Sequence, residues 1–190
     1  MKMQREGIIQ AILINVTSEV FMSTSDFLTG IYNRRKFDEI LSVEIERVNR
    51  YEQFLSIGIL DIDHFKIVND TYGHQAGDKV LQELTGLIAQ HIRKVDYLAR
   101  YGGEEFVILS PNTGLTGMYQ LAEKLRHIIE AHAFHGCNRI TISLGVAQYS
   151  FGETKPMFIE RADAALYQAK AKGRNRVESA EHSANRTTLP

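Results

Sequence analysis

Acidic side chains that could hold a metal ion stand at two places in this 190-residue chain. Asp61 and Asp63 end a short apolar run, and Glu104 and Glu105 follow a pair of glycines at 102–103. If the two segments are neighbouring strands, an aspartate and a glutamate converge at one edge of a sheet. Such a hard, oxygen-rich site suits Mg²⁺, which keeps several waters and also binds substrate phosphates. Acidic residues near turns are more commonly only solvated, so this simpler interpretation stays open.

The glycine pair favours a binding site. Gly102 and Gly103 carry no side chains, so a large ligand can approach the backbone closely. A Gly-Gly pair between two strand-like runs also predicts a tight hairpin, because both glycines can take positive φ. Glu104 directly follows the turn and would then face the ligand.

Cationic residues near expected helix ends could bind phosphates. Lys66, Lys170 and Arg174 would together meet a triphosphate, the lysines as point charges and the arginine as a fork. Gly173 indicates that the last helix ends before Arg174. The alternative is that all three are solvated cations favoured by the helix dipole.

Two polar residues could recognise a guanine. The Asn69 amide can donate to O6 or N7, and the Asp78 carboxylate can accept from N1–H and the 2-amino group. Adenine has no N1–H donor. Each residue has a structural alternative, since Asn69 precedes a turn and Asp78 can cap a helix. His74 is either a ligand contact or a turn residue.

Hydrophobic periodicity predicts interleaved helices and strands. Helices are expected over 34–50, 79–93, 115–132 and 156–172, with a helical start over 64–72. Strands are expected over 54–60, 97–100 and 105–110, and over the alternating segment from Ile140 to Val146. One pair of strands forms a hairpin while the others alternate with helices. The fold class is therefore α/β, a mixed sheet covered by helices.

The chain divides into three parts. Residues 1–25 form a linker whose helix over 1–22 has one apolar stripe, which either pairs with a second subunit or docks on its own domain. Residues 26–178 form the main domain. Residues 179–190 are expected to be a disordered tail, because the chain is polar after about Val177.

Composition excludes several classes of protein. The formal net charge of -1 gives no overall basic field for a nucleic acid or an anionic membrane. No run approaches the roughly 18 apolar residues that span a bilayer. The single cysteine, Cys137, allows no internal disulfide, which indicates a reducing compartment, expected to be the cytoplasm.

Five ordered motifs resemble the GGDEF family of diguanylate cyclases. They are DFLTGIYNRR at 26–35, the segment from Asp61-Ile62-Asp63-His64-Phe65-Lys66 to Asp78, YGGEEF at 101–106, SLGVA at 143–147, and the segment from Ala162 to Arg176. Ile31 replaces the leucine usual in the family, and Glu104 replaces an aspartate. The resemblance covers residues 26 to about 177.

The resemblance implies a fold similar to the palm of nucleotide polymerases, and a nucleotide site with assigned residues. Mg²⁺, or Mn²⁺, would be held by Asp61, the carbonyl of Ile62 and Glu104, with Glu105 assisting. Glu104 would also deprotonate the ribose 3′-hydroxyl. The substrate-binding residues would be Phe65, Lys66, Asn69, His74, Asp78, Gly102, Gly103, Lys170 and Arg174. An aspartate at 78 resembles the guanine-specific form and disfavours ATP.

The implied reaction joins two GTP molecules into cyclic di-GMP and pyrophosphate across a homodimer, with a sensory domain possible upstream. Arg93 and Asp96 resemble the family's R-x-x-D motif for product inhibition. A basic residue of the next helix usually assists, and both Lys124 and Arg126 are candidates. The alternative is an inactive GGDEF module that binds GTP or cyclic di-GMP as a sensor. The intact acidic loop favours the enzyme.

Overall fold

The computed structural model describes residues 24–137 and 139–180, and the strands of this part form one sheet in the order β1-β3-β4-β2-β5-β6. The strands are β1 Tyr32–Asn33, β2 Leu55–Ile62, β3 Tyr97–Arg100, β4 Glu105–Pro111, β5 Ile142–Gln148 and β6 Val177–Ser179. The helices are α2 Arg34–Tyr51, α3 Phe65–Tyr72, α4 His74–His91, α5 Leu115–Ala131 and α6 Lys155–Ala171. The predicted N-terminal helix over 1–22 lies outside the described residues, as do residues 181–190.

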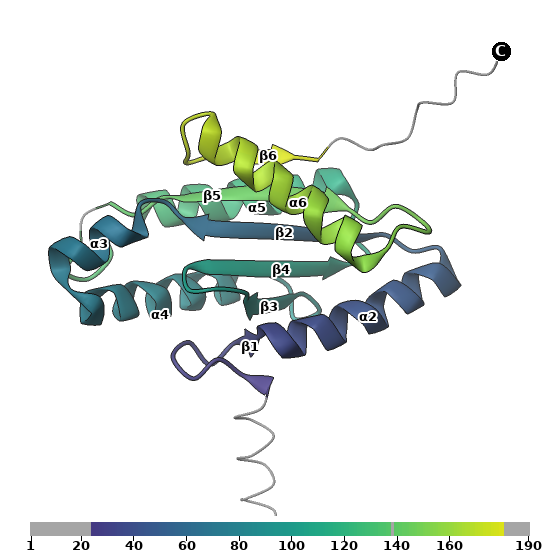
Figure 1. Cartoon of the computed structure of the whole chain (residues 1–190), viewed down its shortest axis with the longest axis horizontal. Helices are drawn as coiled ribbons and strands as arrows, with labels where there is room; N and C mark the ends of the chain where they lie inside the picture. The colour runs from purple at the N-terminus through teal and green to yellow at the C-terminus, as the bar shows by residue number, and fades with distance from the viewer. Residues whose placement is uncertain (1–23, 138, 181–190) are drawn as a thin grey trace, which may run out of the picture.

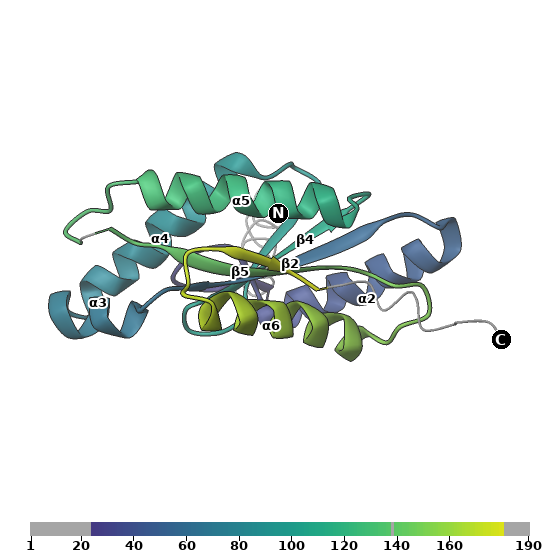
Figure 2. The ribbon, with the colours of Figure 1, turned by 90° about the horizontal axis from the view of Figure 1, so that it is seen from above.

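The sheet is mixed and lies between two layers of helices (Figures 1 and 2). Strand β2 is central and antiparallel to both β4 and β5, whereas the outer strands β1 and β6 pair in parallel with β3 and β5. Helices α4 and α5 cover one face, and α2 and α6 cover the other (Figure 2). The α/β fold class predicted from the sequence is confirmed.

The two faces of β2 bury two separate hydrophobic cores. Leu60 and Ile62 point into the core beneath α4 and α5, while Ile57 and Ile59 point into the core beneath α2 and α6. Side chains alternate along a strand, so Asp61 continues the row that faces α2 and α6. Helices on both faces explain why every residue of β2 is buried.

Helix α4 begins five residues earlier than expected. Gly73 precedes it with φ 83°, a conformation that favours glycine and separates α3 from α4. Asp78 therefore lies inside the helix and is not its cap, which corrects the predicted helix over 79–93. Two other helices have side-chain N-caps: Asn33 accepts from the N–H of Lys36 at the start of α2, and Thr154 accepts from the N–H of Met157 at the start of α6.

The two ends of the β5–α6–β6 unit also differ from prediction. Strand β5 begins at Ile142, not at Ile140. Residues 177–179 form β6 beside β5, and the N–H of Ala180 donates to the carbonyl of Val146 at 2.8 Å. These residues are part of the sheet, so the expectation of disorder directly after Val177 is wrong.

None of the helices within residues 24–137 and 139–180 combines the length and the hydrophobicity that spanning a bilayer requires.

Helix α6 packs directly on β5 at Gly145. A Cβ atom there would lie 2.1 Å from both the Ala162 carbonyl oxygen and the Leu166 nitrogen, which are backbone atoms of α6. This close approach fixes the helix that carries Lys170.

We therefore expect Gly145→Ala to lower the free energy of unfolding by about 2 kcal/mol or more, because the α6 backbone must move away from the sheet. Gly86→Ala is the control, since Gly86 lies in α4 and a Cβ atom there would meet no described atom within 4 Å beyond the backbone of its own helix. That change should stabilise the helix by up to about 1 kcal/mol. Denaturant unfolding of both variants tests the contrast, and equal stabilities would contradict the packing argument.

Candidate active site

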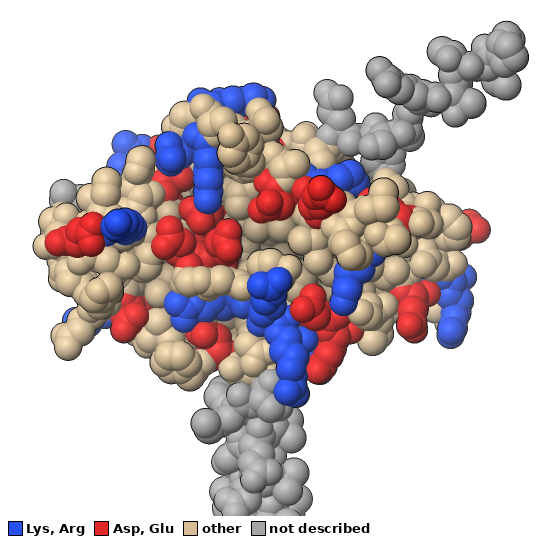
Figure 3. All heavy atoms as spheres, in the orientation of Figure 1, with Lys and Arg blue, Asp and Glu red and all other residues tan. Residues whose placement is uncertain are grey.

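The register of the sheet brings the two acidic segments together. Asp61 of β2 lies directly opposite Glu105 of β4, and the N–H of Ile62 donates to the carbonyl of Glu104 at 3.4 Å. The β3–β4 turn therefore lies beside the end of β2, as the sequence predicted. Figure 3 shows acidic side chains gathered on the face of the molecule near these strand ends.

The Asp61 carboxylate is buried and paired with Lys170, whose Nζ lies 2.9 Å from Oδ2. Burial raises the pKa of Asp61 above its usual range, while Lys170 opposes the rise. Burial also raises the pKa of Glu104, and the negative charge of Asp61 adds to it. The two carboxylates therefore lie close enough to repel each other, and a cation between them would relieve the repulsion.

The glycine turn has a different backbone from the one predicted. Neither Gly102 nor Gly103 has a positive φ. The loop spans residues 101–104, and the N–H groups of Tyr101 and Gly102 both donate to the Glu105 carbonyl, at 2.8 and 3.2 Å. A loop longer than two residues does not need the mirror-image turn. The absence of a side chain at Gly102 instead leaves room for the Glu105 carboxylate, since a Cβ there would lie 2.6 Å from Glu105 Oε2 and that side chain would have to move.

Arg100 ties this loop to the first motif of the chain. Its guanidinium donates to the Gly103 carbonyl, at 2.7 Å from Nη2, and to the Asp26 carboxylate, at 3.1 Å from Nη1. Asp26 in turn accepts from the backbone N–H and the hydroxyl of Thr29. Sequence analysis missed Arg100, because its role depends on the pairing of β3 with β4 and carries no local signal.

Asp61 and Asp63 point in different directions. Asp63 accepts from the hydroxyls of Thr141 and Ser143, both at 2.7 Å, and from the N–H of Asn175 at 3.0 Å. Its carboxylate is buried and accepts all three of these hydrogen bonds. Asp63 therefore organises the strand ends, whereas Asp61 faces the Lys170 side.

The residues considered for guanine lie at the corner between α3 and α4. The Asn69 side chain packs against Gly77, where a Cβ would lie 2.0 Å from Asn69 Oδ1. The absence of a side chain at 77 therefore lets Asn69 approach the helix that carries Asp78. Asp78 and His74 are exposed, and Phe65 is buried beneath this corner.

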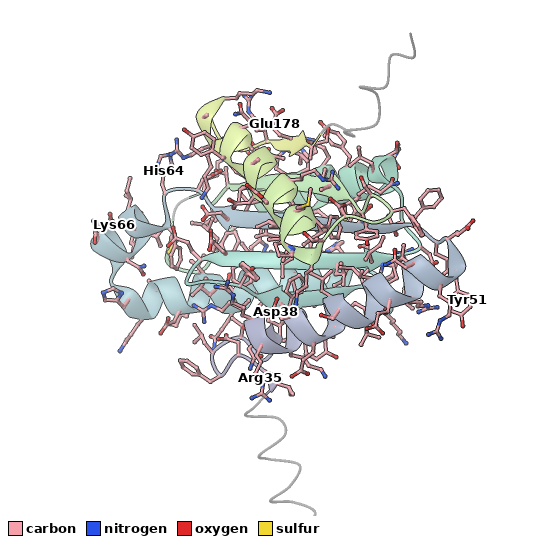
Figure 4. The ribbon with its side chains drawn as sticks, turned by 45° about the vertical axis from the view of Figure 1, so that its right-hand side comes forward. Arg35, Asp38, Tyr51, His64, Lys66 and Glu178 are labelled. Atoms are coloured by element: carbon pink, nitrogen blue, oxygen red, sulfur yellow. The ribbon has the colours of Figure 1, made fainter. Side chains whose placement is uncertain are left out.

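The three phosphate candidates are not equally close to the acidic pair. Lys170 contacts Asp61 directly, and the charge of Arg174 reaches the same carboxylate. Helix α6 ends at Ala171, so Arg174 lies past its end as predicted. Lys66 is exposed on α3, at the end of the molecule opposite Tyr51 (Figure 4).

The R-x-x-D pair lies at the other end of the β3–β4 hairpin. Asp96 is buried and accepts from the Arg93 N–H at 2.8 Å and from its guanidinium at 2.7 Å. The half-exposed Arg93 also donates to the Pro111 carbonyl. A guanine could reach the Asp96 carboxylate only after Arg93 moves.

The structure distinguishes between Lys124 and Arg126 of α5, the two basic residues considered for the product site. Lys124 is exposed, with its Nζ 3.5 Å from the carbonyl of His91 at the end of α4, two residues before Arg93. Arg126 is buried and bound to Glu123, Glu130 and Asn175. Lys124 is therefore the candidate that accompanies Arg93.

Within residues 24–137 and 139–180, no group of three or more His, Cys, Asp or Glu side chains could hold a metal ion by itself. The acidic pair is nevertheless suited to Mg²⁺, which binds to one or two carboxylates and completes its shell with water and substrate phosphates. Asp61 and Glu104 supply these hard oxygen ligands. The chemistry of the donor set therefore fits an ion that arrives with a nucleotide.

Comparison with known proteins points to one family. A family model described as diguanylate cyclase, GGDEF domain, matches residues 23–176. The chain is 45% identical over 159 residues to diguanylate cyclase DgcP of Pseudomonas aeruginosa, covering 82% of this chain and 24% of that protein. It spans less than half the length of the first curated relatives that it matches.

Solved structures agree with this match. The coiled coil and GGDEF domain of Caulobacter crescentus DgcB, in complex with c-di-GMP, superposes with a TM-score of 0.88 at 32% identity, covering 93% of this chain and 96% of that one. The active GGEEF domain of a Vibrio cholerae diguanylate cyclase gives a TM-score of 0.76 at 37% identity, covering 80% of this chain and 98% of that one.

The repulsion between the carboxylates predicts that Glu104→Gln stabilises the protein without added metal or nucleotide. Because the folded-state pKa of Glu104 is raised, its ionised carboxylate destabilises the folded protein at pH values above that pKa. This destabilisation disappears as the pH falls through the folded-state pKa. We expect a gain on the order of 0.5 kcal/mol, about 1–2 °C in Tm, near pH 7. The gain should shrink near pH 4.

Glu46→Gln, on the exposed face of α2, is the matched control and should leave Tm nearly unchanged at both values of pH. Differential scanning calorimetry provides the measurement. A Glu104→Gln variant that is less stable than wild type near neutral pH would show that the carboxylates do not oppose each other.

Proposed function

This chain belongs to the GGDEF family of diguanylate cyclase domains, and on that premise we propose that it condenses two GTP molecules into cyclic di-GMP and pyrophosphate. The observation that carries the proposal is the strand register that sets Asp61 opposite Glu105 and beside Glu104, with the Lys170 ammonium 2.9 Å from Asp61. The glycine turn leaves the backbone next to them open to a nucleotide.

The divalent ion would be Mg²⁺ or Mn²⁺, held by Asp61, the Ile62 carbonyl and Glu104, with Glu105 assisting. Such an ion neutralises phosphate charge and lowers the pKa of a nearby hydroxyl. Mutual repulsion of the acidic side chains supports this assignment, because each anionic group favours a cation more strongly when the other is present.

Glu104 is the proposed acceptor of the ribose 3′-hydroxyl proton. A general base works best when its pKa approaches the working pH. Burial and the Asp61 charge both move the pKa of Glu104 in this direction. The oxygen freed of its proton then attacks the α-phosphate of the other nucleotide, and pyrophosphate leaves.

The remaining contacts would fix the nucleotide. Asn69 and Asp78 recognise guanine from the α3–α4 corner, with Phe65 and His74 lining the same place. The packing of Asn69 on Gly77 supports a shared site for the two polar groups. Lys66, Lys170 and Arg174 bind the phosphates. Asp78 has no N1–H partner in ATP, so ATP is a poor substrate.

One subunit holds one GTP, so the reaction needs a homodimer in which two half-sites face each other. Aligning the reactants is the main catalytic contribution of such an arrangement. Segment 1–25 would connect the domain to a partner and to an upstream sensory module, in the cytoplasm. Any signal that changes how the two half-sites face each other would change the rate of cyclic di-GMP formation.

Product would bind at a second site formed by Arg93 and Lys124, with Asp96 holding Arg93 in place or joining the ligand after it moves. The half-exposed guanidinium of Arg93 can stack on or donate to a guanine. The position of the Lys124 ammonium near the end of α4 supports its inclusion.

The central test is turnover of GTP with Mg²⁺ by the purified chain, followed by chromatography of the products. We expect cyclic di-GMP from GTP and no cyclic dinucleotide from ATP. Glu104→Gln should lower kcat by about a hundredfold or more, because it removes both an ion ligand and the base. Glu46→Gln should retain wild-type kcat. Wild-type binding of GTP without product would identify the inactive sensor module instead.

Product inhibition tests the second site separately. Arg93→Ala and Lys124→Ala should each raise the inhibition constant of cyclic di-GMP, by roughly tenfold for a lost charged contact. Arg93→Ala should also lower Tm, since it leaves the buried Asp96 carboxylate without its guanidinium. Lys94→Ala, an exposed neighbour, is the control. Unchanged inhibition in both test variants would refute the site.

A further inference from the structure

The segment that carries Arg174 has an unfavourable backbone. Gly173, Arg174 and Asn175 have φ values of 113°, 64° and 46°, so three consecutive residues are in the left-handed region. Each non-glycine residue there costs on the order of 1 kcal/mol. Such conformations persist only where the surroundings hold them, so the contacts of this segment decide where Arg174 lies.

Asn175 provides these contacts with its backbone and its side chain. Its N–H donates to Asp63 Oδ2 at 3.0 Å, and its side-chain Oδ1 accepts from Arg126 Nη1 at 3.1 Å. The side-chain Nδ2 donates to Glu130 Oε1 at 2.8 Å. The segment is therefore fastened at one residue to both the end of β2 and helix α5.

Arg126 is itself held in a single orientation. Only 10% of its side chain is exposed, and it donates to Glu123 Oε2 and Glu130 Oε2, each at 3.0 Å. These residues stand three before and four after it on α5, where helical neighbours meet. Burying a guanidinium is costly unless its partners are placed well. Glu123 and Glu130 orient the guanidinium so that its Nη1 donates to the Asn175 side chain.

The hydrogen bonds between Asn175 and helix α5 link elements on opposite faces of the sheet. Helices α5 and α6 lie on opposite faces, with β6 between them (Figure 2). Arg126 thus reaches past the β6 edge to the chain that leaves α6. Neither α6 nor the following strand supplies a side-chain hydrogen bond from a described residue to the Asn175 amide.

We propose that Arg126 is a positioning residue for the nucleotide triphosphate, acting through Asn175 to place Arg174. It does not touch the substrate. The identity of the phosphates rests on the proposed function, whereas the fastening of residues 173–175 does not.

Arg126→Lys tests the proposal, because lysine keeps the charge and the stem but loses the fork. We expect KM for GTP to rise roughly tenfold while kcat changes by less than about threefold, the signature of lost substrate binding. The matched control is Arg161→Lys. Arg161 is also mostly buried, at 18% exposure, and binds Glu153 at the far end of α6. A similar KM in both variants would overturn the proposal.

A double-mutant cycle separates positioning from general damage. In an Arg174→Gln background, Arg126→Lys should cause no further rise in KM, because the group that it positions is already absent. If the two substitutions instead multiply their separate effects, Arg126 does not act through Arg174 and the inference is wrong.

Amide hydrogen exchange gives a readout that needs no turnover. The Asn175 N–H should exchange at least about tenfold faster in Arg126→Lys than in wild type, and no faster in Arg161→Lys. A wild-type chain that makes no cyclic di-GMP would refute the proposed function, yet exchange at Asn175 would still test the fastening. Unaltered exchange in Arg126→Lys would overturn it.

Discussion

The antiparallel register of β2 and β4 is the constraint on which the rest of the site depends. It sets Asp61 opposite Glu105 and brings the Glu104 backbone onto Ile62. Carboxylates thereby lie near one another at a partly buried edge, where burial raises the pKa values of Asp61 and Glu104 and the charge of Asp61 raises that of Glu104 further. The fold accepts this unfavourable electrostatic energy, which a cation bound between the carboxylates would remove.

The scaffold around this edge is rigid because helices bury both faces of the sheet. Gly145 lets α6 lie directly on β5, which brings Lys170 within 2.9 Å of Asp61. Asp63, two residues further on, accepts from two hydroxyls and a backbone N–H. One aspartate of the pair thus faces Lys170 at the candidate site, while the other orders the strand ends. Loops that carry functional groups need such a support.

A single short hairpin connects the two candidate sites. The β3–β4 turn forms one wall of the acidic site, and the opposite end of the same hairpin lies beside Arg93 and Asp96. Helix α5 likewise carries two cations with different tasks. Lys124 faces the Arg93 side, whereas Arg126 holds the segment after α6. The proposed substrate and product sites therefore share the β3–β4 hairpin and helix α5.

Local sequence determined the helices, most strands and the chemical character of the site. Periodicity reports which face of an element is buried, so α2, α5, α6 and the β3–β4 pair were predicted closely. Tertiary structure alone decided the short edge strands β1 and β6, the space requirement at Gly145, and the link from Arg126 through Asn175 to Asp63. Those features join residues far apart in the chain. Their geometry follows from strand register and helix packing, which no short window of sequence specifies.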